Sequence, residues 1–260
     1  MGLYLSYLKM LLKTQLQYRM SFFLLLLGQT MVPLLSLAGI ALLFSRFGSL
    51  AGWTVQEAFL CFGVTHMAFA LATVFARGFD TFSQIIVNGE FDRILVRPRS
   101  TVLQILGARM DFTRLGRLVQ GAVLLAWSAS AAGIPWTPLR AFTLAGMVFG
   151  GSIVFSGVYI LAAVLCFKTI QGIEMANIFT DGGREIAQYP LSIYPRNLVR
   201  FFTYIIPFAT FNYIPLLWIL GRDGIGAVPA AAAPWLGSLF ILPCLLLWRI
   251  GVRKYLSTGS

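Results

Sequence analysis

Few side chains in this sequence have the types and spacing that catalysis or metal binding requires. The single histidine, His66, lies within an apolar stretch without a partner spaced to form a metal site or a nucleophile pair. The three cysteines, Cys61, Cys166 and Cys244, lie in apolar segments and form no CxxC pair, which argues against a zinc site or a disulfide framework. No lysine follows a glycine, so no GxxxxGK[ST] loop is present, and we expect another subunit to bind any ATP that is used.

The remaining candidates are charged residues set among apolar ones, and the densest group lies at 79–98. Four apolar residues fall at spacings of three and four, which is typical of one helical face: Phe79, Phe82, Ile85 and Ile86. Five charged residues share the segment: Asp80, Glu90, Asp92, Arg93 and Arg97. We predict a short helix on the inner surface of a membrane, available to a soluble partner. A basic loop held on lipid headgroups is the alternative.

The composition indicates a polytopic membrane protein. Of 260 residues, 58% are hydrophobic and 11% are charged, and the mean hydropathy of +0.80 is far above that of soluble domains. The net charge of +11 does not indicate nucleic-acid binding, because the basic residues lie between apolar spans and not in one solvated patch. We treat residues 1–260 as one membrane domain.

The chain is predicted to be all-α with six transmembrane helices. Residues 3–19 have the pattern of an interfacial helix in the headgroup plane. Five apolar runs are long enough for spans or nearly so: 22–44, 58–76, about 118–134, the interval between 140 and 168, and about 235–248. With these spans, all but three of the 20 Lys and Arg residues lie inside, which predicts cytoplasmic termini. The three outside are Arg46, Arg140 and Arg222.

The position of the remaining span is ambiguous between two segments. Residues 173–188 are polar, and charges at membrane depth usually face a cavity or a partner. If the segment is cytoplasmic instead, its charges stay in water and carry no free-energy cost of burial in the membrane. Residues 201–220 are apolar and overlap a stretch at 189–215 whose prolines at 190, 195, 207 and 215 break it into pieces too short to span individually. Broken helices of this kind line a cavity or are covered by protein, although an ordinary kinked span is also possible.

The order of these elements resembles the permease subunits of ABC-2 type transporters, and within them a bacterial group related to daunorubicin-resistance exporter permeases. The resemblance covers nearly the whole chain and is most specific at GEFDRILVRP (89–98) and YPLSIYP (189–195). It implies a cytoplasmic coupling helix between the second and third spans, at 79–98, that contacts an ATPase. The residues expected to make or support that contact are Phe82, Ile85, Glu90, Phe91, Asp92, Arg93 and Arg97, with apolar side chains in a groove of the ATPase and charges fixing the register.

The same resemblance implies a fifth span at 167–189 and re-entrant helices at 190–222, which dip into the membrane from the outer face before the sixth span. A charged fifth span departs from the usual pattern. We therefore expect it to face the pathway or a subunit interface, with Arg184 paired to Asp181 or Glu185. The expected pathway or interface residues are Glu174, Asp181, Arg184, Glu185, Tyr189, Pro190, Tyr194 and Pro195.

These expectations describe a transport subunit without catalytic residues of its own. The resemblance implies a bacterial inner-membrane exporter in which two permeases, identical or different, pair with two ATPase subunits. ATP and magnesium would bind in the ATPase, and no cofactor is expected in this chain. An ion-coupled transporter or channel without an ATPase is the alternative, with Glu174 or Asp181 carrying the ion. A lipid-modifying intramembrane enzyme is a weaker alternative, because the chain has one histidine and no acidic pair at a span end.

Overall fold

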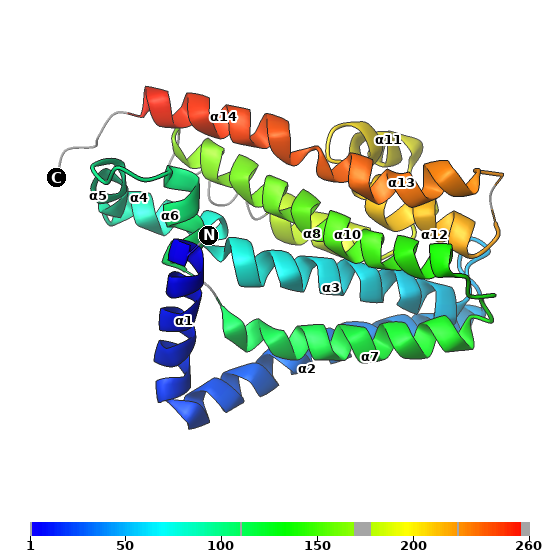
Figure 1. The fold of residues 1–260 in the computed structure, drawn as a ribbon. Helices are drawn as coiled ribbons and strands as arrows, with labels where there is room; N and C mark the ends of the chain where they lie inside the picture. The colour runs from blue at the N-terminus through cyan, green and yellow to red at the C-terminus, as the bar shows by residue number, and fades with distance from the viewer. Residues whose placement is uncertain (1, 110, 169–177, 223, 256–260) are drawn as a thin grey trace.

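The chain forms an elongated bundle of helices (Figure 1). The structure is a computed structural model that describes residues 2–109, 111–168, 178–222 and 224–255. No strand occurs among these residues, which confirms the predicted all-α class. The helices are α1 (Gly2–Gln17), α2 (Arg19–Phe47), α3 (Val55–Asp80), α4 (Phe82–Val87), α5 (Glu90–Leu95), α6 (Thr101–Ala108), η1 (Phe112–Arg114), α7 (Leu115–Ala131), α8 (Pro138–Cys166), η2 (Ile178–Gly182), α10 (Gly183–Ala187), η3 (Leu191–Ile193), α11 (Arg196–Tyr204), η4 (Ala209–Tyr213), α12 (Ile214–Ile219), α13 (Ala227–Ser238) and α14 (Ile241–Lys254).

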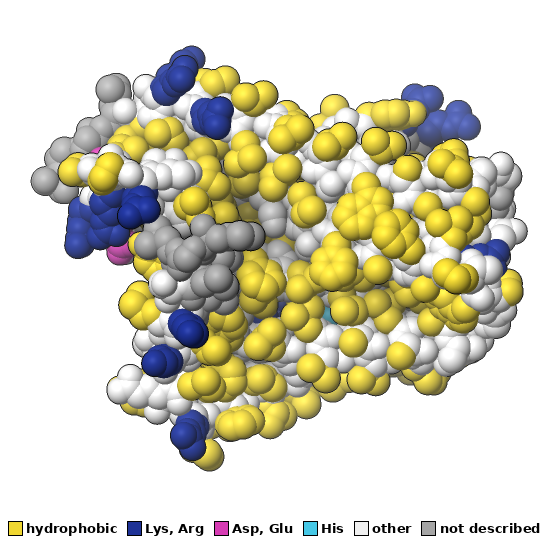
Figure 2. All heavy atoms as spheres, viewed as in Figure 1, with side chains coloured by type: hydrophobic (Ala, Val, Ile, Leu, Met, Phe, Trp, Pro, Cys, Tyr) yellow, Lys and Arg dark blue, Asp and Glu magenta, His cyan; other side chains and the backbone are white. Residues whose placement is uncertain are grey.

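Helix α3 forms the centre of the bundle. It packs mainly against α8 and α7, while α13 and α14 lie along α8. Buried residues run along nearly the whole of α3, whereas only three residues of α2 are buried, so α2 forms an outer edge. Helix α1 crosses the end of the bundle at a steep angle, and the last helix, α14, ends at that same end (Figure 1). We call it the basic end, because many Lys and Arg side chains gather there (Figure 2).

Several helices have the length and composition of membrane spans. Among the described residues, four helical stretches could cross a membrane: 19–47, 55–87, 138–166 and 227–254. The count is five if α11 and the η4–α12 helix, which meet at 94°, form one bent span. Helix α7 has 17 residues, or about 26 Å at a rise of 1.5 Å per residue, and is shorter than these four. The chain is thus a multi-pass membrane protein, and the full six-span layout stays a prediction.

The chain segment from 192 to 222 begins and ends beside the same connection, the loop between α2 and α3. Near its start, the Trp53 indole Nε1 donates a hydrogen bond of 2.8 Å to Ser192 Oγ. Near its end, the Arg222 guanidinium donates to the Gly52 carbonyl at 2.8 Å, lies 2.6 Å from a Glu57 carboxylate oxygen and stacks 4.7 Å above the Trp53 ring. The segment therefore turns back on itself and returns to the end where it started.

Arg222 is expected to hold this return in place. Replacing it with alanine should lower the free energy of unfolding by about 1–3 kcal/mol, because the Glu57 carboxylate and the Gly52 carbonyl both lose a charged donor. Arg222→Lys should recover only part of this loss, because a single ammonium cannot reproduce the planar contacts to three partners. Thermal unfolding of the purified protein in detergent measures both changes. Full recovery with lysine would contradict the proposed geometry.

A buried polar network joins α3 to the segment after α8. The Thr65 hydroxyl donates to the Ala187 carbonyl at 2.8 Å, and the Asn212 amide donates to Thr65 Oγ1 at 2.9 Å and also to the Ala187 carbonyl. Ala187 is the last residue of α10, so these bonds satisfy a helix-terminal carbonyl that has no partner within its own helix. The network fixes α10 and η4 against the middle of α3.

At the basic end, α3 and α6 approach each other so closely that only glycine fits between them. A Cβ atom built on Gly78 would lie 1.8 Å from the carbonyl oxygen of Ile105 and 2.8 Å from its carbonyl carbon. Both atoms belong to the backbone, so no side-chain rotation could relieve the clash. Just before Gly78, Ala76 has φ −116° and ψ 15°, so α3 is locally non-helical there. Because Gly78 has no side chain, α6 can pack directly against the end of α3.

Candidate functional site at the basic end

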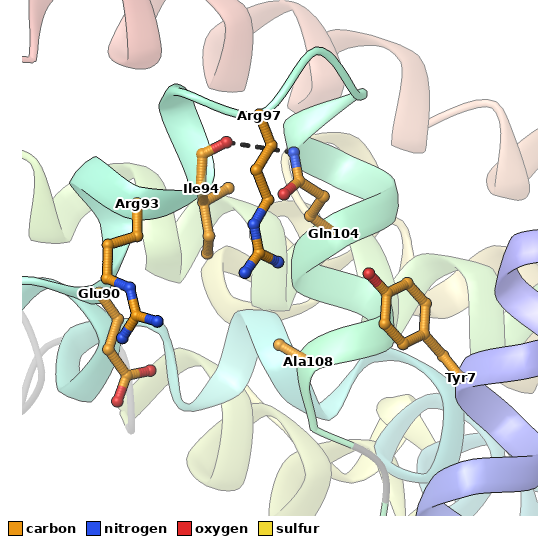
Figure 3. Close-up of a pocket in the computed structure, with 7 residues that line it drawn as sticks. All are labelled: Tyr7, Glu90, Arg93, Ile94, Arg97, Gln104 and Ala108. Carbon is orange, nitrogen blue, oxygen red and sulfur yellow. Dashed lines mark hydrogen bonds between the residues drawn. The ribbon is translucent and has the colours of Figure 1, made fainter.

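The segment 82–108 folds into three short helices, which we call the α4–α6 unit. Gly89 separates α4 from α5 with φ +67°, a conformation that other residues rarely adopt. The Gln104 side-chain amide then donates to the carbonyl of Ile94 in α5 (Figure 3) and to that of Arg99 in the following loop, both at 3.1 Å, and so ties α6 to the two segments before it. The predicted helix at 79–98 is therefore the end of α3 followed by α4 and α5.

The apolar face of this unit packs into the chain's own core. Phe82 and Phe91 are fully buried, and Ile85 is 1% exposed. These side chains were expected to dock in a groove of a partner, but in this structure they are not on the surface. Periodicity identified the apolar face correctly, although it could not indicate that distant segments of the same chain cover it.

An aromatic cluster, defined as Phe79, Phe82, Phe91, Phe167, Trp248 and Tyr255, provides that cover. The Trp248 ring centroid lies 4.9 Å from that of Phe82, 5.1 Å from that of Phe167 and 6.1 Å from that of Phe91. Tyr255 closes the cluster, with its ring centroid 5.0 Å from that of Phe91. Aromatic pairs at these separations add about 0.5–1.5 kcal/mol per pair beyond burial. The cluster fastens the α4–α6 unit to the ends of α8 and α14.

The opposite face of the unit is exposed and carries both charge and apolar surface. Arg93 and Arg97 are exposed, Glu90 and Asp92 are half-buried, and Val96 is 85% exposed between the two arginines. Of the charged members of the predicted contact set, Glu90, Arg93 and Arg97 line one cleft at the surface, where a partner could reach them. The Asp92 carboxylate lies instead near the Tyr255 hydroxyl.

A cleft of about 210 Å³ runs between this face and α1. It is lined by Tyr7 from α1, by Glu90, Arg93, Ile94 and Arg97 from the α5 region, and by Gln104 and Ala108 from α6 (Figure 3). A Cβ on Gly107 would lie 2.7 Å from the Tyr7 ring, so α1 touches α6 directly beside the cleft. Tyr7 and Gln104 were not anticipated from the sequence, because neither stands out by charge or spacing.

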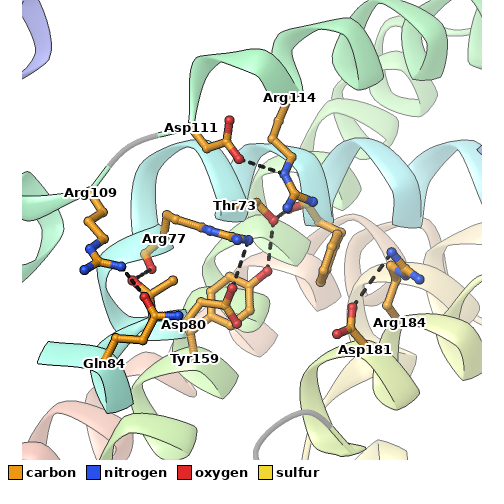
Figure 4. A network of polar contacts seen from close by, with 12 residues as sticks. Thr73, Arg77, Asp80, Gln84, Arg109, Asp111, Arg114, Tyr159, Asp181 and Arg184 are labelled. Carbon is orange, nitrogen blue, oxygen red and sulfur yellow. Dashed lines mark hydrogen bonds and ion pairs between the residues drawn. The ribbon is translucent and has the colours of Figure 1, made fainter. Parts of the chain in front are cut away.

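A second cavity, of about 310 Å³, lies where α3, α4, η1 and η2 meet, and we call it the charged cavity. Its lining is mostly polar: Phe69, Arg77, Asp80, Thr81, Ser83, Gln84, Arg114 and Asp181. Two ion pairs lie at its wall, Arg77 with Asp80 at 3.0 Å and Arg114 with Asp111 at 3.1 Å (Figure 4). Sequence analysis missed these pairs, although opposite charges three residues apart were a usable signal.

The electrostatics at this cavity favour the charged form of Asp111, which lies in the connection before α7. Burial by itself raises the pKa of the Asp111 carboxyl. Hydrogen bonds from Thr113 and Arg114, together with the positive charges of Arg114 and Arg77, outweigh burial and hold this pKa below its usual range. A carboxylate kept ionised in this way holds Arg114 at the start of α7.

The residues predicted for the pathway or subunit interface divide between two places. Arg184 Nη1 lies 3.9 Å from Asp181, and the Arg184 guanidinium also pairs with Glu185, so both expected pairings occur. Asp181 lines the charged cavity, whereas the four residues of the YPLSIYP segment belong to the turn after α10: Tyr189, Pro190, Tyr194 and Pro195. Glu174 lies outside the described residues. The structure does not gather the whole predicted set into one site.

His66 lies in the middle of α3, buried at 6% exposure. Its ring stacks on Phe62, with centroids 5.4 Å apart and planes 14° apart. His66 is thus a packed residue, as its place in an apolar stretch suggests, but it is not hydrogen-bonded through Nε2, which has no partner among the described residues. The structure places it away from the α4–α6 unit.

Comparison with known proteins identifies one family. The family model described as ABC-2 family transporter protein matches residues 30–259, which is most of the chain. Comparison with curated proteins and with solved structures gives no significant match.

Proposed function

Because the chain belongs to the ABC-2 transporter family, whose members are membrane transport components, we propose that it is the permease subunit of an ABC exporter. In this proposal it forms the translocation pathway with a second permease, identical or different, and each permease couples to a separate ATPase subunit. ATP and magnesium belong to the ATPase. The resemblance to the bacterial group related to daunorubicin-resistance exporters favours export across the inner membrane.

One observation carries the proposal: the α4–α6 unit presents Arg93, Val96 and Arg97 outward while its apolar face is locked into the chain. A loop that only joined two spans would not need to be anchored to the ends of two other helices in this way. The cleft beside α1 offers a recess for a side chain or helix from the ATPase, with charges of both signs at its edge. We assign the ATPase contact to Glu90, Asp92, Arg93 and Arg97, and a supporting role to Phe82, Ile85 and Phe91.

The aromatic cluster gives this contact a mechanical connection to the membrane helices. A displacement of the α4–α6 unit is transmitted to the ends of α8 and α14 through Phe167 and Trp248. The non-helical residue Ala76 lies four residues before the end of α3, so α3 can bend there while the part before it stays packed. ATP-driven closure of the ATPase subunits would thus tilt α8 and α14 relative to α3.

The contacts of the 192–222 segment support the re-entrant arrangement. The segment starts and ends beside the α2–α3 connection, at the end of the bundle opposite the α4–α6 unit. If residues 167–189 cross the membrane, the chain makes six passes and both termini lie on the side of the ATPase. We place that side in the cytoplasm, in agreement with the bias of Lys and Arg. Helix α1 would then lie at the inner interface.

Charge reversal on the exposed face tests the ATPase contact. The amount of ATPase that co-purifies with the Arg93→Glu/Arg97→Glu variant should be at least about tenfold lower than with the wild-type chain, because two favourable contacts become repulsive. The matched control is Arg196→Glu/Arg200→Glu, which reverses the same number of exposed charges at the same spacing on α11. The control should co-purify with the ATPase as the wild type does.

Two outcomes would contradict the proposal. Equal recovery of the ATPase with both variants would show that the α4–α6 unit is not the contact. If the wild-type chain recovers no ATPase, and transport depends instead on an ion gradient, the ion-coupled alternative gains support. Asp181, an exposed carboxylate in the charged cavity, would then be the first residue to test as an ion carrier.

A further inference from the structure

A third cavity at the basic end lies between the start of α6 and the end of α14, on a different side of the α4–α6 unit from the α1 cleft. Its volume is about 530 Å³, larger than that of the α1 cleft or of the charged cavity. The transport proposal makes no use of it. We propose that it binds the headgroup and upper acyl chain of an anionic phospholipid and thereby joins α6 to α14.

The polar side of the cavity is suited to a phosphate. Arg249 and Arg253 both line it, and their spacing of four residues places them on the same face of α14. Both are exposed, and within the described residues neither forms an ion pair, so both guanidinium groups remain available to an anion. The cavity thus carries two positive charges and has no acidic residue in its lining.

Hydroxyl groups from α6 complete this polar side. The Thr101 hydroxyl oxygen accepts a hydrogen bond of 3.2 Å from the Trp248 indole, which leaves the hydroxyl hydrogen of Thr101 to donate. Ser100, the residue before the first turn of α6, makes no side-chain capping bond. Both residues line the cavity together with the two arginines. A phosphate here would therefore receive hydrogen bonds from both α6 and α14.

The other side of the cavity is apolar, and this distinguishes a lipid from a soluble phosphate. Val102, Leu245, Trp248 and Val252 form it, and Leu245 lies one helical turn further from the chain terminus than Arg249. Helix α14 is part of a candidate membrane span, so the apolar side continues toward hydrocarbon. An amphiphile with a negative headgroup matches both sides, whereas a free phosphate or a nucleotide matches only one.

A lipid bound in this cavity would also affect how the α4–α6 unit packs against α14. Trp248 forms one wall of the cavity and is also a central member of the aromatic cluster. A headgroup held by Thr101 and Arg249 would therefore bridge the α4–α6 unit and α14 at the point where they already pack together. Anionic lipid should make this junction more rigid, in addition to any general attraction of the basic end to the membrane surface.

The test uses the full-length chain in nanodiscs or detergent and measures bound lipid by native mass spectrometry. The probes are phosphatidylglycerol, phosphatidylcholine and soluble glycerol 3-phosphate. The wild-type chain should bind phosphatidylglycerol at least about tenfold more tightly than phosphatidylcholine. Arg249→Gln/Arg253→Gln should remove most of that preference, and Arg249→Lys/Arg253→Lys, which keeps the charge, should retain it in part. The measurement needs no ATPase, so it can succeed or fail independently of the proposed transport function.

Lys9→Gln/Lys13→Gln serves as the matched control, since it removes two exposed charges at the same end of the bundle from helix α1. This variant should change phosphatidylglycerol affinity less than twofold. An equal loss in the control would show that diffuse charge, and not the cavity, attracts lipid. Retention of the preference in the glutamine variant, or equally tight binding of glycerol 3-phosphate, would also overturn the proposal.

Discussion

Replacing Phe91 with alanine is expected to lower the free energy of unfolding by about 3–5 kcal/mol, the range for removing a fully buried aromatic side chain. Phe91 has its ring against those of Phe82, Phe167, Trp248 and Tyr255, with centroid separations between 5.0 and 6.1 Å. The space left behind is enclosed by rigid rings and cannot close easily. The change is measured as a shift in thermal unfolding of the purified chain.

The informative control for Phe91→Ala is Val96→Ala, five residues further along and 85% exposed. This control should leave the stability unchanged but weaken ATPase binding, whereas Phe91→Ala should reduce both. If Phe91→Ala left the unfolding temperature of the chain unchanged while ATPase binding was lost, Phe91 would have to contact the ATPase directly. The buried position described here would then be incorrect.

Replacing Gly78 with alanine is expected to prevent correct packing of the α4–α6 unit. The added methyl group would lie 1.8 Å from the Ile105 carbonyl oxygen, so α6 would have to move away from α3. Forced insertion into a packed interior typically costs about 1–3 kcal/mol, and a backbone clash of this size lies at or above the upper end of that range. The expected result is low recovery of folded protein and a strongly reduced unfolding temperature.

Gly28→Ala is the matched control, because a Cβ at Gly28 has nothing within 4 Å and α2 is otherwise helical there. It should be neutral or slightly stabilising, since alanine is the better helix former by about 0.5–1 kcal/mol. Similar behaviour of the two variants would mean that α3 and α6 do not approach each other as described.

The sequence allowed the protein class and the family to be predicted, because both depend on local composition and on motif order. The resemblance to ABC-2 transporters, based on GEFDRILVRP and YPLSIYP, is confirmed by the family match over 30–259, whereas the narrower likeness to daunorubicin-resistance exporters stays a prediction. The local pairing of Arg184 with Asp181 and Glu185 was also foreseeable from spacing alone. In each case the relevant residues are close together in the chain.

The long-range contacts could not be predicted in this way. The apolar face of 79–98 is covered by Phe167 and Trp248, which lie more than 75 residues away in the sequence. Likewise, the close approach at Gly78 depends on the path of α6, and the return of the 192–222 segment depends on Trp53 and Glu57. No periodicity in the sequence encodes which distant residues meet.

The aromatic cluster also affects how a binding experiment on this protein should be interpreted. Because Phe91 and Trp248 share one core, local opening of α14 requires that core to separate. An ATPase bound to the far face of α5 would therefore slow amide hydrogen exchange in α14 without touching it. A hydrogen-exchange footprint would be wider than the true contact, and cross-linking from Arg93 or Arg97 would be needed to find its edge.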